Sequence, residues 1–293
     1  MPYLILLNKP KGVTSFHAVA RVRRALGEKR IGHTGTLDPM ATGVLPLLTG
    51  RASRLSSLML DADKSYRATV RLGTVTDTLD ITGEVLKTSP VNVSDQQLLE
   101  ALEHFTGEIT QVPPMYSALK KDGVRLYELA RQGKEVKRES RQVKIKELKL
   151  VKRRGSTDFI IDVTCSKGTY IRTLGSDIGE YLGVGATLTE LQRTAVSGFS
   201  IDTTVPLDEF EKEPQKYLLS PELCVKHLSK VNVTEAQSTR FLHGGQLDLN
   251  RLHGIDNLCD GQLLRVCRGD RFLGIGKIDI EHNQLSVGCV IEE

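Results

Sequence analysis

The chain has 293 residues, of which 39% are apolar and 26% charged, and its formal net charge is +4. This is the composition of a globular protein with room for one large domain, or for a large and a small one, and it excludes extended disorder. No run approaches the ~18 consecutive apolar residues of a membrane span, so a cytoplasmic protein without membrane contact is expected. The five cysteines form no CxxC pair, which predicts neither a disulfide framework nor a metal site.

The small net charge conceals an uneven distribution. Residues 1–35 hold seven Lys or Arg against one acid, and residues 120–154 hold fourteen against five, so the rest of the chain is acidic on balance. Two basic segments on an otherwise acidic chain are typical of a protein that binds a polyanion such as nucleic acid. Each segment taken singly also fits a solvated charged surface.

The N-terminal third begins with a predicted buried strand at residues 3–9. Thr14 can cap a helix that ends at Gly27, where apolar residues recur at helical spacing between the two. Residues 30–43 are rich in glycine, contain a proline and have no clean period. They predict a long structured loop, and such a loop in a compact domain is usually functional.

The remaining elements indicate an α+β protein without a regular βαβ repeat. Strands are expected at residues 64–72, 143–150 and 159–165, the second with a bulge near Glu147, and helices at residues 94–104 and 125–131. The acidic stretch 208–214 is interpreted as a connection. Short strands separated by glycines then predict a small all-β domain at residues 229–293.

Asp38 is the most prominent candidate for a chemical role. It lies in GHTGTLDP, residues 32–39, where the glycines allow tight turns and Pro39 stiffens the exit. A carboxylate presented from fixed backbone suits a nucleophile, although Asp38 could equally cap a turn. The DKTGTL loop of phosphoryl-transferring ATPases is only superficially similar, because its aspartate precedes the KTGT, where Ile31 and Gly32 stand here.

Two further features of the N-terminal region are candidates for substrate contact. His33 can stack on a base, form a hydrogen bond or simply pack. Lys9 and Lys11 flank Pro10 just before the first helix, where cationic side chains and free N–H groups can together hold a phosphate.

Five motifs follow one another along residues 3–200. They are NKPKGVTS at residues 8–15, GHTGTLDPMATGVLP at 32–46, DKSYRATVRLG at 63–73, PPMYSALKKDG at 113–123 and CSKGTYIRTL at 165–174. In this order they resemble the bacterial TruB family of tRNA pseudouridine synthases. The first motif departs slightly, because the family more often has aspartate where Asn8 stands.

The resemblance implies a role for individual residues. Asp38 matches the catalytic aspartate, Tyr66 an active-site tyrosine, and Arg172 the arginine that pairs with the aspartate. The implied substrate-binding residues are His33, in the space vacated by the flipped uridine, Tyr170 in the same pocket, Leu191 beneath the base, and Lys9 and Pro10 near the rim. No metal ligand is implied.

The resemblance also implies a fold and a partner. The expected fold is the α+β pseudouridine synthase catalytic domain at residues 1–228, with a mixed, largely antiparallel sheet and a basic RNA-clasping insertion at about 113–140. A PUA-like RNA-binding module follows at 229–293, where HGGQL at 243–247 matches an early turn. The implied partner is tRNA, bound by a monomer at its T-stem-loop, and the RNA-contacting candidates are Lys120, Lys121, Lys134 and Lys137.

The implied reaction converts uridine-55 to pseudouridine after the base has been flipped out of the RNA. It breaks the glycosidic bond, rotates the uracil and rejoins it through carbon 5, without redox change or net hydrolysis, so no cofactor is expected. Arg172 would hold Asp38 ionised by a two-pronged contact, and Tyr66 would act as the base at C2′ in a route through a glycal. The sequence leaves open whether a glycal or a covalent adduct is formed.

Two functions from other classes remain compatible with the residues alone. A non-catalytic RNA-binding protein would be favoured if Asp38, Tyr66 or Arg172 were replaced, and none is. An aspartate-nucleophile hydrolase would require a second carboxylate or a metal site near the first.

Overall fold

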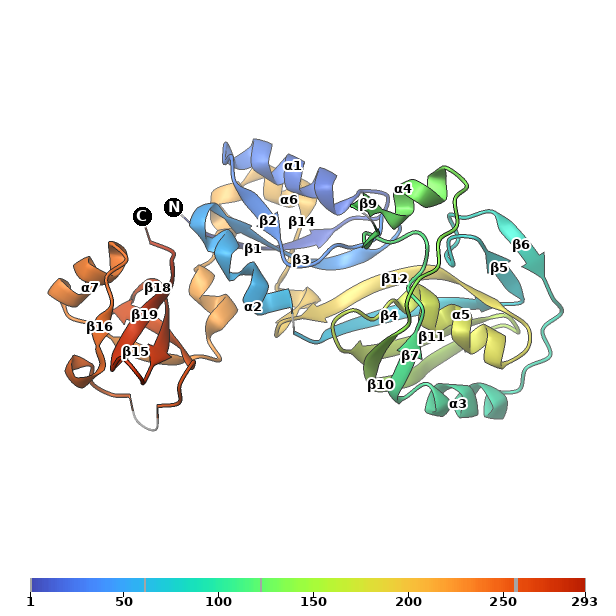
Figure 1. The fold of residues 1–293 in the computed structure, drawn as a ribbon. Coiled ribbons are helices and arrows are strands. Elements are labelled where there is room, and N and C mark those ends of the chain that lie inside the picture. The colour runs from blue at the N-terminus through green and yellow to red at the C-terminus, as the bar shows by residue number, and fades with distance from the viewer. Residues whose placement is uncertain (1, 61, 122, 256–257, 293) are drawn as a thin grey trace.

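The computed structural model describes residues 2–60, 62–121, 123–255 and 258–292. Its strands form one long sheet, which runs through the N-terminal and central parts of the chain, and a smaller sheet near the C-terminus (Figure 1). Among the described residues, no helix has both the length and the apolar character to cross a membrane.

The large sheet is mixed and mainly antiparallel. Its order is β14 (Val205–Pro206), β1 (Leu4–Lys9), β3 (Thr42–Thr49), β12 (Ala186–Val196), β4 (Lys64–Leu72), β11 (Asp158–Cys165), β10 (Arg141–Arg154) and β7 (Gly107–Gln111). Strand β2 (Ile31–His33) pairs with β3, and β13 (Phe199–Ser200) with β12. Within the described part of this sheet, the β1–β14 and β3–β12 pairs are parallel and the other pairs are antiparallel. The α+β fold with a largely antiparallel sheet is therefore confirmed.

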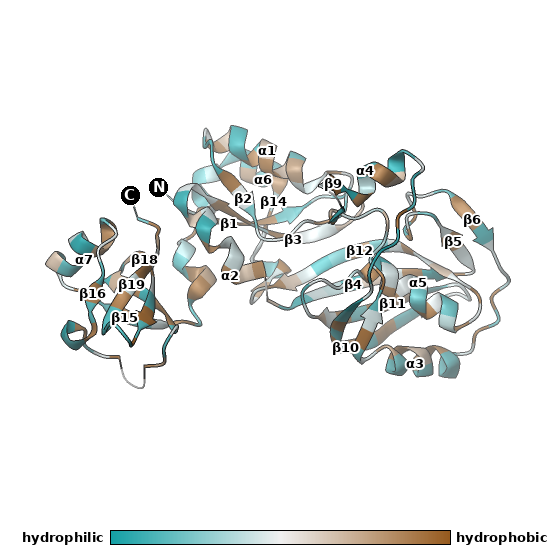
Figure 2. Cartoon of the chain, in the orientation of Figure 1, coloured by the Kyte–Doolittle hydropathy of each residue, from teal (hydrophilic) through white to brown (hydrophobic). Residues whose placement is uncertain are grey.

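The helices of this part of the chain differ in the strands that they contact. They are α1 (Ser15–Leu26), α2 (Ser56–Leu60), α3 (Asp95–His104), α4 (Leu126–Arg131), α5 (Ile171–Tyr181) and α6 (Leu207–Lys212). Two small hairpins, β5 (Thr74–Thr76) with β6 (Val85–Thr88) and β8 (Lys120–Lys121) with β9 (Val124–Arg125), lie outside the sheet. Helix α5 packs on β12 and β4. The helices in Figure 2 carry both hydrophobic and hydrophilic residues, as expected for helices with one buried face.

The smaller sheet has the order β15 (Ser229–Asn232), β17 (Leu263–Arg268), β18 (Arg271–Asp279), β19 (Gln284–Val290) and β16 (Leu247–Asp248). Helix α7 (Glu235–Leu242) packs against it around the buried Phe241. A separate apolar cluster joins this part of the chain to the large sheet, since Ile275 and Ile291 pack with Leu4, Leu48 and Met59.

Several local predictions are confirmed. Thr14 caps α1 and Gly27 ends it with a φ of 65°. Ser94 and Gln97 form the expected capping box of α3. Strand β10 has a register shift between Ile145 and Glu147, where the bulge was predicted.

Three segments differ from the sequence prediction. The first residues of the loop at 30–43 form β2, because Ile31–His33 pair with β3. The acidic stretch at 208–214 is not a plain connection but overlaps helix α6, which buries Leu207 and Phe210 and pairs Asp208 with Arg21 of α1. The C-terminal part contains α7 in addition to its strands.

Candidate functional site

Asp38 lies in the turn between β2 and β3, which we call the Asp38 loop (residues 34–41). The start of α1 holds this loop in place by hydrogen bonds. The backbone N–H of Leu37 donates to Ser15 Oγ at 2.9 Å, and that hydroxyl donates back to the Leu37 carbonyl at 3.1 Å. The N–H of Gly12 donates to the Pro39 carbonyl at 2.8 Å. The backbone on both sides of Asp38 is therefore fixed before any substrate binds.

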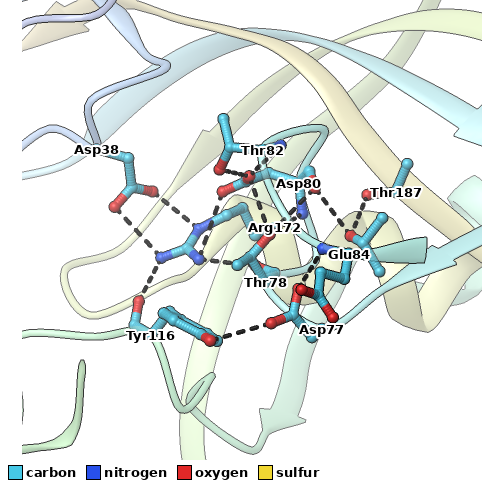
Figure 3. Close-up of polar contacts among 10 residues, drawn as sticks. Asp38, Asp77, Thr78, Asp80, Thr82, Glu84, Tyr116, Arg172 and Thr187 are labelled. Carbon is cyan, nitrogen blue, oxygen red and sulfur yellow. Dashed lines mark hydrogen bonds and ion pairs between the residues drawn. The ribbon is translucent and has the colours of Figure 1, made fainter. Parts of the chain in front are cut away.

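Asp38 and Arg172 form an ion pair at the centre of the site (Figure 3). Arg172 Nη2 donates to Asp38 Oδ1 at 3.2 Å, and Arg172 Nε lies 2.9 Å from Asp38 Oδ2 without the alignment of a hydrogen bond. The Arg172 side chain is 4% exposed and that of Asp38 is 34% exposed. The arginine is thus part of the protein interior, while the carboxylate is open on one side to a ligand.

Arg172 is held by more than its carboxylate partner. Arg172 Nη1 donates to the Thr78 carbonyl at 2.8 Å and Nη2 to the Tyr116 carbonyl at 2.7 Å. A second carboxylate, Asp80, lies 3.6 Å from Nη1 and is itself buried. These contacts from different loops fix the plane of the guanidinium, and so the direction in which it meets Asp38.

The turn that carries Asp80 is closed by its own polar side chains. Asp80 Oδ1 accepts from the Thr82 N–H at 2.9 Å and from Thr78 Oγ1 at 3.0 Å. Asp77 in the same turn accepts from the hydroxyl of Tyr116 at 3.0 Å. Tyr116 belongs to the insertion at 113–140, so the root of the insertion and the Arg172 contacts are linked through one residue.

The electrostatics of Asp38 reflect two opposing effects. Removal from water raises the pKa of Asp38, whereas the Arg172 guanidinium lowers it, and the nearby Asp80 raises it again. The carboxylate of Asp80 thus partly offsets the lowering of the Asp38 pKa by Arg172.

Tyr66 and Leu191 lie side by side on one face of the sheet. Tyr66 on β4 is directly opposite Arg193 on β12, and Leu191, two residues before Arg193, is opposite Ala68. Tyr66 is 8% exposed and Leu191 7%. Burial raises the pKa of Tyr66 to about 12, although the charge of Arg193 works in the opposite direction. At neutral pH the phenol therefore carries its proton.

Lys9 does not present its ammonium to solvent. The side chain is fully buried, and Nζ donates to the carbonyls of Pro10 at 2.8 Å, Val13 at 2.6 Å and Pro39 at 3.4 Å. Burial lowers the pKa of Lys9 to about 8, against the effect of Asp38. In this conformation Lys9 tethers the residue after Asp38, whereas Pro10 stays partly exposed beside it.

His33 is at the end of β2, at the entrance to the Asp38 loop. Its Nδ1 accepts from the Gly35 N–H at 3.3 Å. Burial and the charge of Arg193 lower the pKa of His33, so the ring is neutral at neutral pH. A neutral, half-buried imidazole suits contact with an uncharged base.

Tyr170 is the residue before α5, two positions before Arg172. Gln111 holds its backbone from both sides, accepting from the Tyr170 N–H at 3.1 Å and donating to its carbonyl at 3.3 Å. The guanidinium of Arg141 lies over the Tyr170 ring, 4.7 Å from its centroid. The ring is therefore stacked under a side chain of the basic segment.

The four insertion lysines are exposed, and the fold brings two parts of the insertion together. Lys120 and Lys121 are in the β8–β9 hairpin, and Lys121 Nζ donates to the carbonyl of Lys137 at 3.1 Å. Lys134 and Lys137 follow α4. The insertion thus presents all four ammonium groups on the surface.

Three residues of the site were missed by the sequence analysis. Asp80 and Tyr116 brace Arg172, and Arg193 faces Tyr66. The signal for Asp80 was the polar run TDTLDITG, which closes a turn on itself, and the signal for Arg193 was a charged residue at a buried position of a strand. Within the described ranges, no group of three or more His, Cys, Asp or Glu side chains is arranged to hold a metal ion.

Two of the solved structures that the chain resembles are multi-component complexes. One is described as a structure of an H/ACA RNP bound to a substrate RNA containing 2′-deoxyuridine, with a TM-score of 0.73 and 26% identity over 99% of this chain and 85% of that chain. Another is a Cbf5–Nop10–Gar1 complex, with a TM-score of 0.72, 28% identity, and coverage of 99% of this chain and 84% of that chain.

Comparison with protein families identifies the type of enzyme more specifically than these structures do. Residues 23–171 match the TruB family pseudouridylate synthase N-terminal domain, and residues 172–221 the tRNA pseudouridylate synthase B C-terminal domain. Residues 229–286 match the pseudouridine synthase II TruB C-terminal domain. The fold is thus that of a pseudouridine synthase.

Relatives that align with most of the chain narrow the class of pseudouridine synthase to which it belongs. The tRNA pseudouridine synthase B of Aromatoleum aromaticum is 46% identical over 281 residues, which cover 94% of this chain and 88% of the relative. That of Chromobacterium violaceum is 49% identical over 245 residues, 82% of this chain and 80% of the relative. The chain belongs to the TruB family of pseudouridine synthases, which are isomerases that convert uridine to pseudouridine.

Proposed function

We propose that this protein isomerises uridine-55 in the T-loop of tRNA by a reaction that depends on Asp38. Membership of the TruB family makes it a tRNA pseudouridine synthase. The observation that carries the finer proposal is the ion pair in which a buried Arg172 orients a carboxylate that is open on one side. Such an arrangement favours the charged form of a reactive group, against the effect of its burial, and aims it at the substrate.

Two routes for the isomerisation are compatible with this site, and Asp38 forms a bond to the substrate only in the second. In the first, the C1′–N1 bond breaks, uracil leaves with the bonding electrons, and the Tyr66 oxygen, ionised to the phenolate, takes the C2′ proton, which gives a glycal. In the second, Asp38 Oδ attacks C1′ and displaces uracil to form an adduct. In both, the uracil rotates and C5 bonds to C1′, while the Tyr66 hydroxyl returns the proton to C2′ of the glycal in the first route and the bond between C1′ and Asp38 breaks in the second. The C5 proton is then lost and N1 is reprotonated, so the product is an isomer of the substrate.

The remaining site residues are proposed to hold the flipped nucleotide. His33 fills the space that the uridine leaves, Leu191 lies beneath the base, and Tyr170 packs in the same pocket. Pro10 contacts the substrate at the rim. Lys9 acts from inside, because its ammonium tethers the Pro39 carbonyl next to Asp38.

The hydrolase alternative is less well supported by the geometry. A second carboxylate is indeed close, since Asp80 lies on the other side of Arg172 from Asp38 (Figure 3). However, Asp80 is 4% exposed, and its Oδ1 accepts from Thr78 and Thr82. A carboxylate enclosed in this way can brace an arginine but cannot activate a water on the substrate side.

For the RNA partner, we propose that residues 1–228 form the catalytic domain and residues 229–293 a PUA-like RNA-binding domain, in a cytoplasmic monomer. The insertion at 113–140 would clasp the T-stem-loop through Lys120, Lys121, Lys134 and Lys137. Their exposure and shared surface support this role, because ammonium groups that contact phosphates must be accessible.

The experiment that tests the substrate proposal compares two small RNAs. Purified protein is incubated with an isolated T-stem-loop and, as a control, with an anticodon stem-loop of equal length, and pseudouridine is quantified in each. Conversion confined to the T-loop uridine is expected. Equal conversion of both RNAs, or conversion of the anticodon loop alone, would overturn the proposal for the T-loop while leaving the isomerase activity intact.

A further inference from the structure

Arg193 is a fully buried arginine that the proposed reaction does not yet use. It is on β12, is 1% exposed, and is among the largest side chains that the protein encloses completely. Among the residues that the structure describes, no carboxylate forms an ion pair with it. Burying a charge without a partner of opposite sign is costly, so a structural role alone would be served better by an apolar side chain.

The guanidinium of Arg193 connects the two ends of the Asp38 loop. Arg193 Nε donates to the Val44 carbonyl at 2.7 Å, just after the loop, and Nη2 donates to the Gly35 carbonyl at 3.2 Å, near its beginning. The backbone fits around it closely. Gly43 is the strand partner of Arg193 and has a φ of 106°. A Cβ at Gly43 would lie 2.2 Å from the Arg193 carbonyl oxygen, which leaves no room for a side chain there.

The same side chain faces Tyr66. Residues Gly43, Arg193 and Tyr66 form one rung across β3, β12 and β4, and directly opposite residues of neighbouring strands share a face of the sheet. Burial lowers the pKa of Arg193, and the Tyr66 phenol is the group that works in the opposite direction. Arg193 is therefore placed between the loop that carries Asp38 and the phenol that the proposed reaction uses.

We propose that Arg193 is a positioning residue for the isomerisation, which holds the Asp38 loop at its two ends and stabilises negative charge on the Tyr66 oxygen. This inference rests on the proposed role of Tyr66 in taking the C2′ proton. A phenol that keeps its proton at neutral pH accepts another only as the phenolate, and a fixed cation opposite the oxygen lowers the free energy of that form.

Two other titratable groups among the described residues have a clear effect on Tyr66. They are Cys165 on β11 and Asp38 in its loop, and both oppose ionisation of the phenol. Arg193 on β12 is the group that favours it. Removal of the arginine charge should therefore move the titration of Tyr66 to higher pH.

The test measures this titration directly. 3,5-Difluorotyrosine is placed at position 66, because fluorine brings the phenol pKa into an accessible range and reports it by ¹⁹F NMR. The pKa is compared in the otherwise wild-type chain, in Arg193→Gln, which removes the charge but keeps a hydrogen-bond donor, and in Arg193→Lys, which keeps the charge. Single-turnover pseudouridine formation and affinity for a T-stem-loop RNA are measured with the natural Tyr66 in the same three backgrounds.

The proposal predicts that the pKa at position 66 is about one unit higher in Arg193→Gln than in Arg193→Lys. Arg193→Gln should also lose turnover by about tenfold or more, while its RNA affinity stays within a few-fold of wild type. The matched control is Arg67→Gln, since Arg67 is next to Tyr66 on β4 but on the opposite face, where it pairs with Asp162. This control should change neither the pKa nor the turnover.

An unchanged pKa in Arg193→Gln would overturn the proposal even if turnover fell, because the arginine would then act only on the stability of the loop. Unchanged turnover would overturn it as well. Failure of the underlying function is distinguishable: if Tyr66→Phe keeps its single-turnover rate, the role of Tyr66 is wrong whatever Arg193 does. If Tyr66→Phe is inactive and the pKa does not move, only the inference about Arg193 fails.

Discussion

Replacement of Arg172 by lysine tests whether the geometry of the Asp38 ion pair matters beyond its charge. Arg172 spreads its contacts over a plane, with two nitrogens towards Asp38 and two donors to the carbonyls of Thr78 and Tyr116. A lysine ammonium is a single point with three donors on a flexible stem, so it cannot satisfy both carbonyls and also contact both oxygens of Asp38. The Arg172→Lys variant should fold but hold the carboxylate loosely.

The magnitudes follow from these contacts. At least one buried carbonyl loses its donor, which should lower the free energy of unfolding by about 1–3 kcal/mol. A displacement of the reacting carboxylate by about 1 Å should reduce single-turnover pseudouridine formation by about a hundredfold. Affinity for a T-stem-loop RNA should stay within a few-fold of wild type, because Arg172 is too deeply buried to contact the RNA backbone.

The matched control is Arg67→Lys. Arg67 makes a comparable two-pronged contact with Asp162, at 2.7 and 2.6 Å, but its side chain is 52% exposed. An exposed pair contributes about 0–1 kcal/mol, so this variant should match wild type in turnover and nearly in stability. The reasoning is refuted if Arg172→Lys keeps turnover within tenfold of wild type, or if its loss disappears at saturating enzyme, since Arg172 would then be a binding determinant only.

Three further predictions concern other parts of the site. Tyr66→Phe should bind a T-stem-loop RNA normally and accumulate bound, unconverted uridine in single-turnover assays, because the ring is kept and only the hydroxyl is lost; parallel losses of affinity and turnover would contradict the proton-transfer role. Neutralising Lys120, Lys121, Lys134 and Lys137 together should reduce the slope of log affinity against log salt by up to roughly 3, and an unchanged slope would place the RNA elsewhere. The pKa of Lys9 is about 8 in the folded protein, below the ordinary value of 10.5. Between these two pH values the unfolded chain therefore binds more protons than the folded one. The contribution of Lys9 to the free energy of unfolding should rise with pH across that range. Unfolding free energies of wild type minus Lys9→Met should therefore rise from pH 8 to 10, and a flat difference would mean that Lys9 is not perturbed.

The sequence predicted those elements whose signals are local. Helix α3 begins at Ser94 because the reciprocal capping contacts need only residues three apart. Strand β4 was predicted with its observed bounds, since its apolar residues Tyr66, Ala68, Val70 and Leu72 alternate with polar ones in the sequence. The family resemblance supplied Asp38 and Arg172, and the structure brings these two residues into contact although 134 positions separate them.

The features that were missed depend on partners far along the chain. Strand β2 forms because its backbone pairs with the edge of β3. Its own sequence contains a glycine and shows no alternation of apolar and polar residues. Helix α6 forms on a short acidic stretch because α1 supplies Arg21 as a partner for Asp208 and Glu211. The burial of Lys9 depends in the same way on the Pro39 carbonyl from a distant loop. No pattern within a single segment contains such information.

The most direct test of the central claim is to map pseudouridine at single-nucleotide resolution in an unmodified, full-length tRNA transcript after incubation with wild-type protein or with Asp38→Asn. The amide keeps the shape of the side chain but removes its negative charge. Wild type should convert uridine-55 and leave the other uridines unmodified, and Asp38→Asn should form no pseudouridine while binding the transcript within a few-fold of wild type. Modification at a different position, or more than about a hundredth of wild-type turnover in Asp38→Asn, would contradict the assignment.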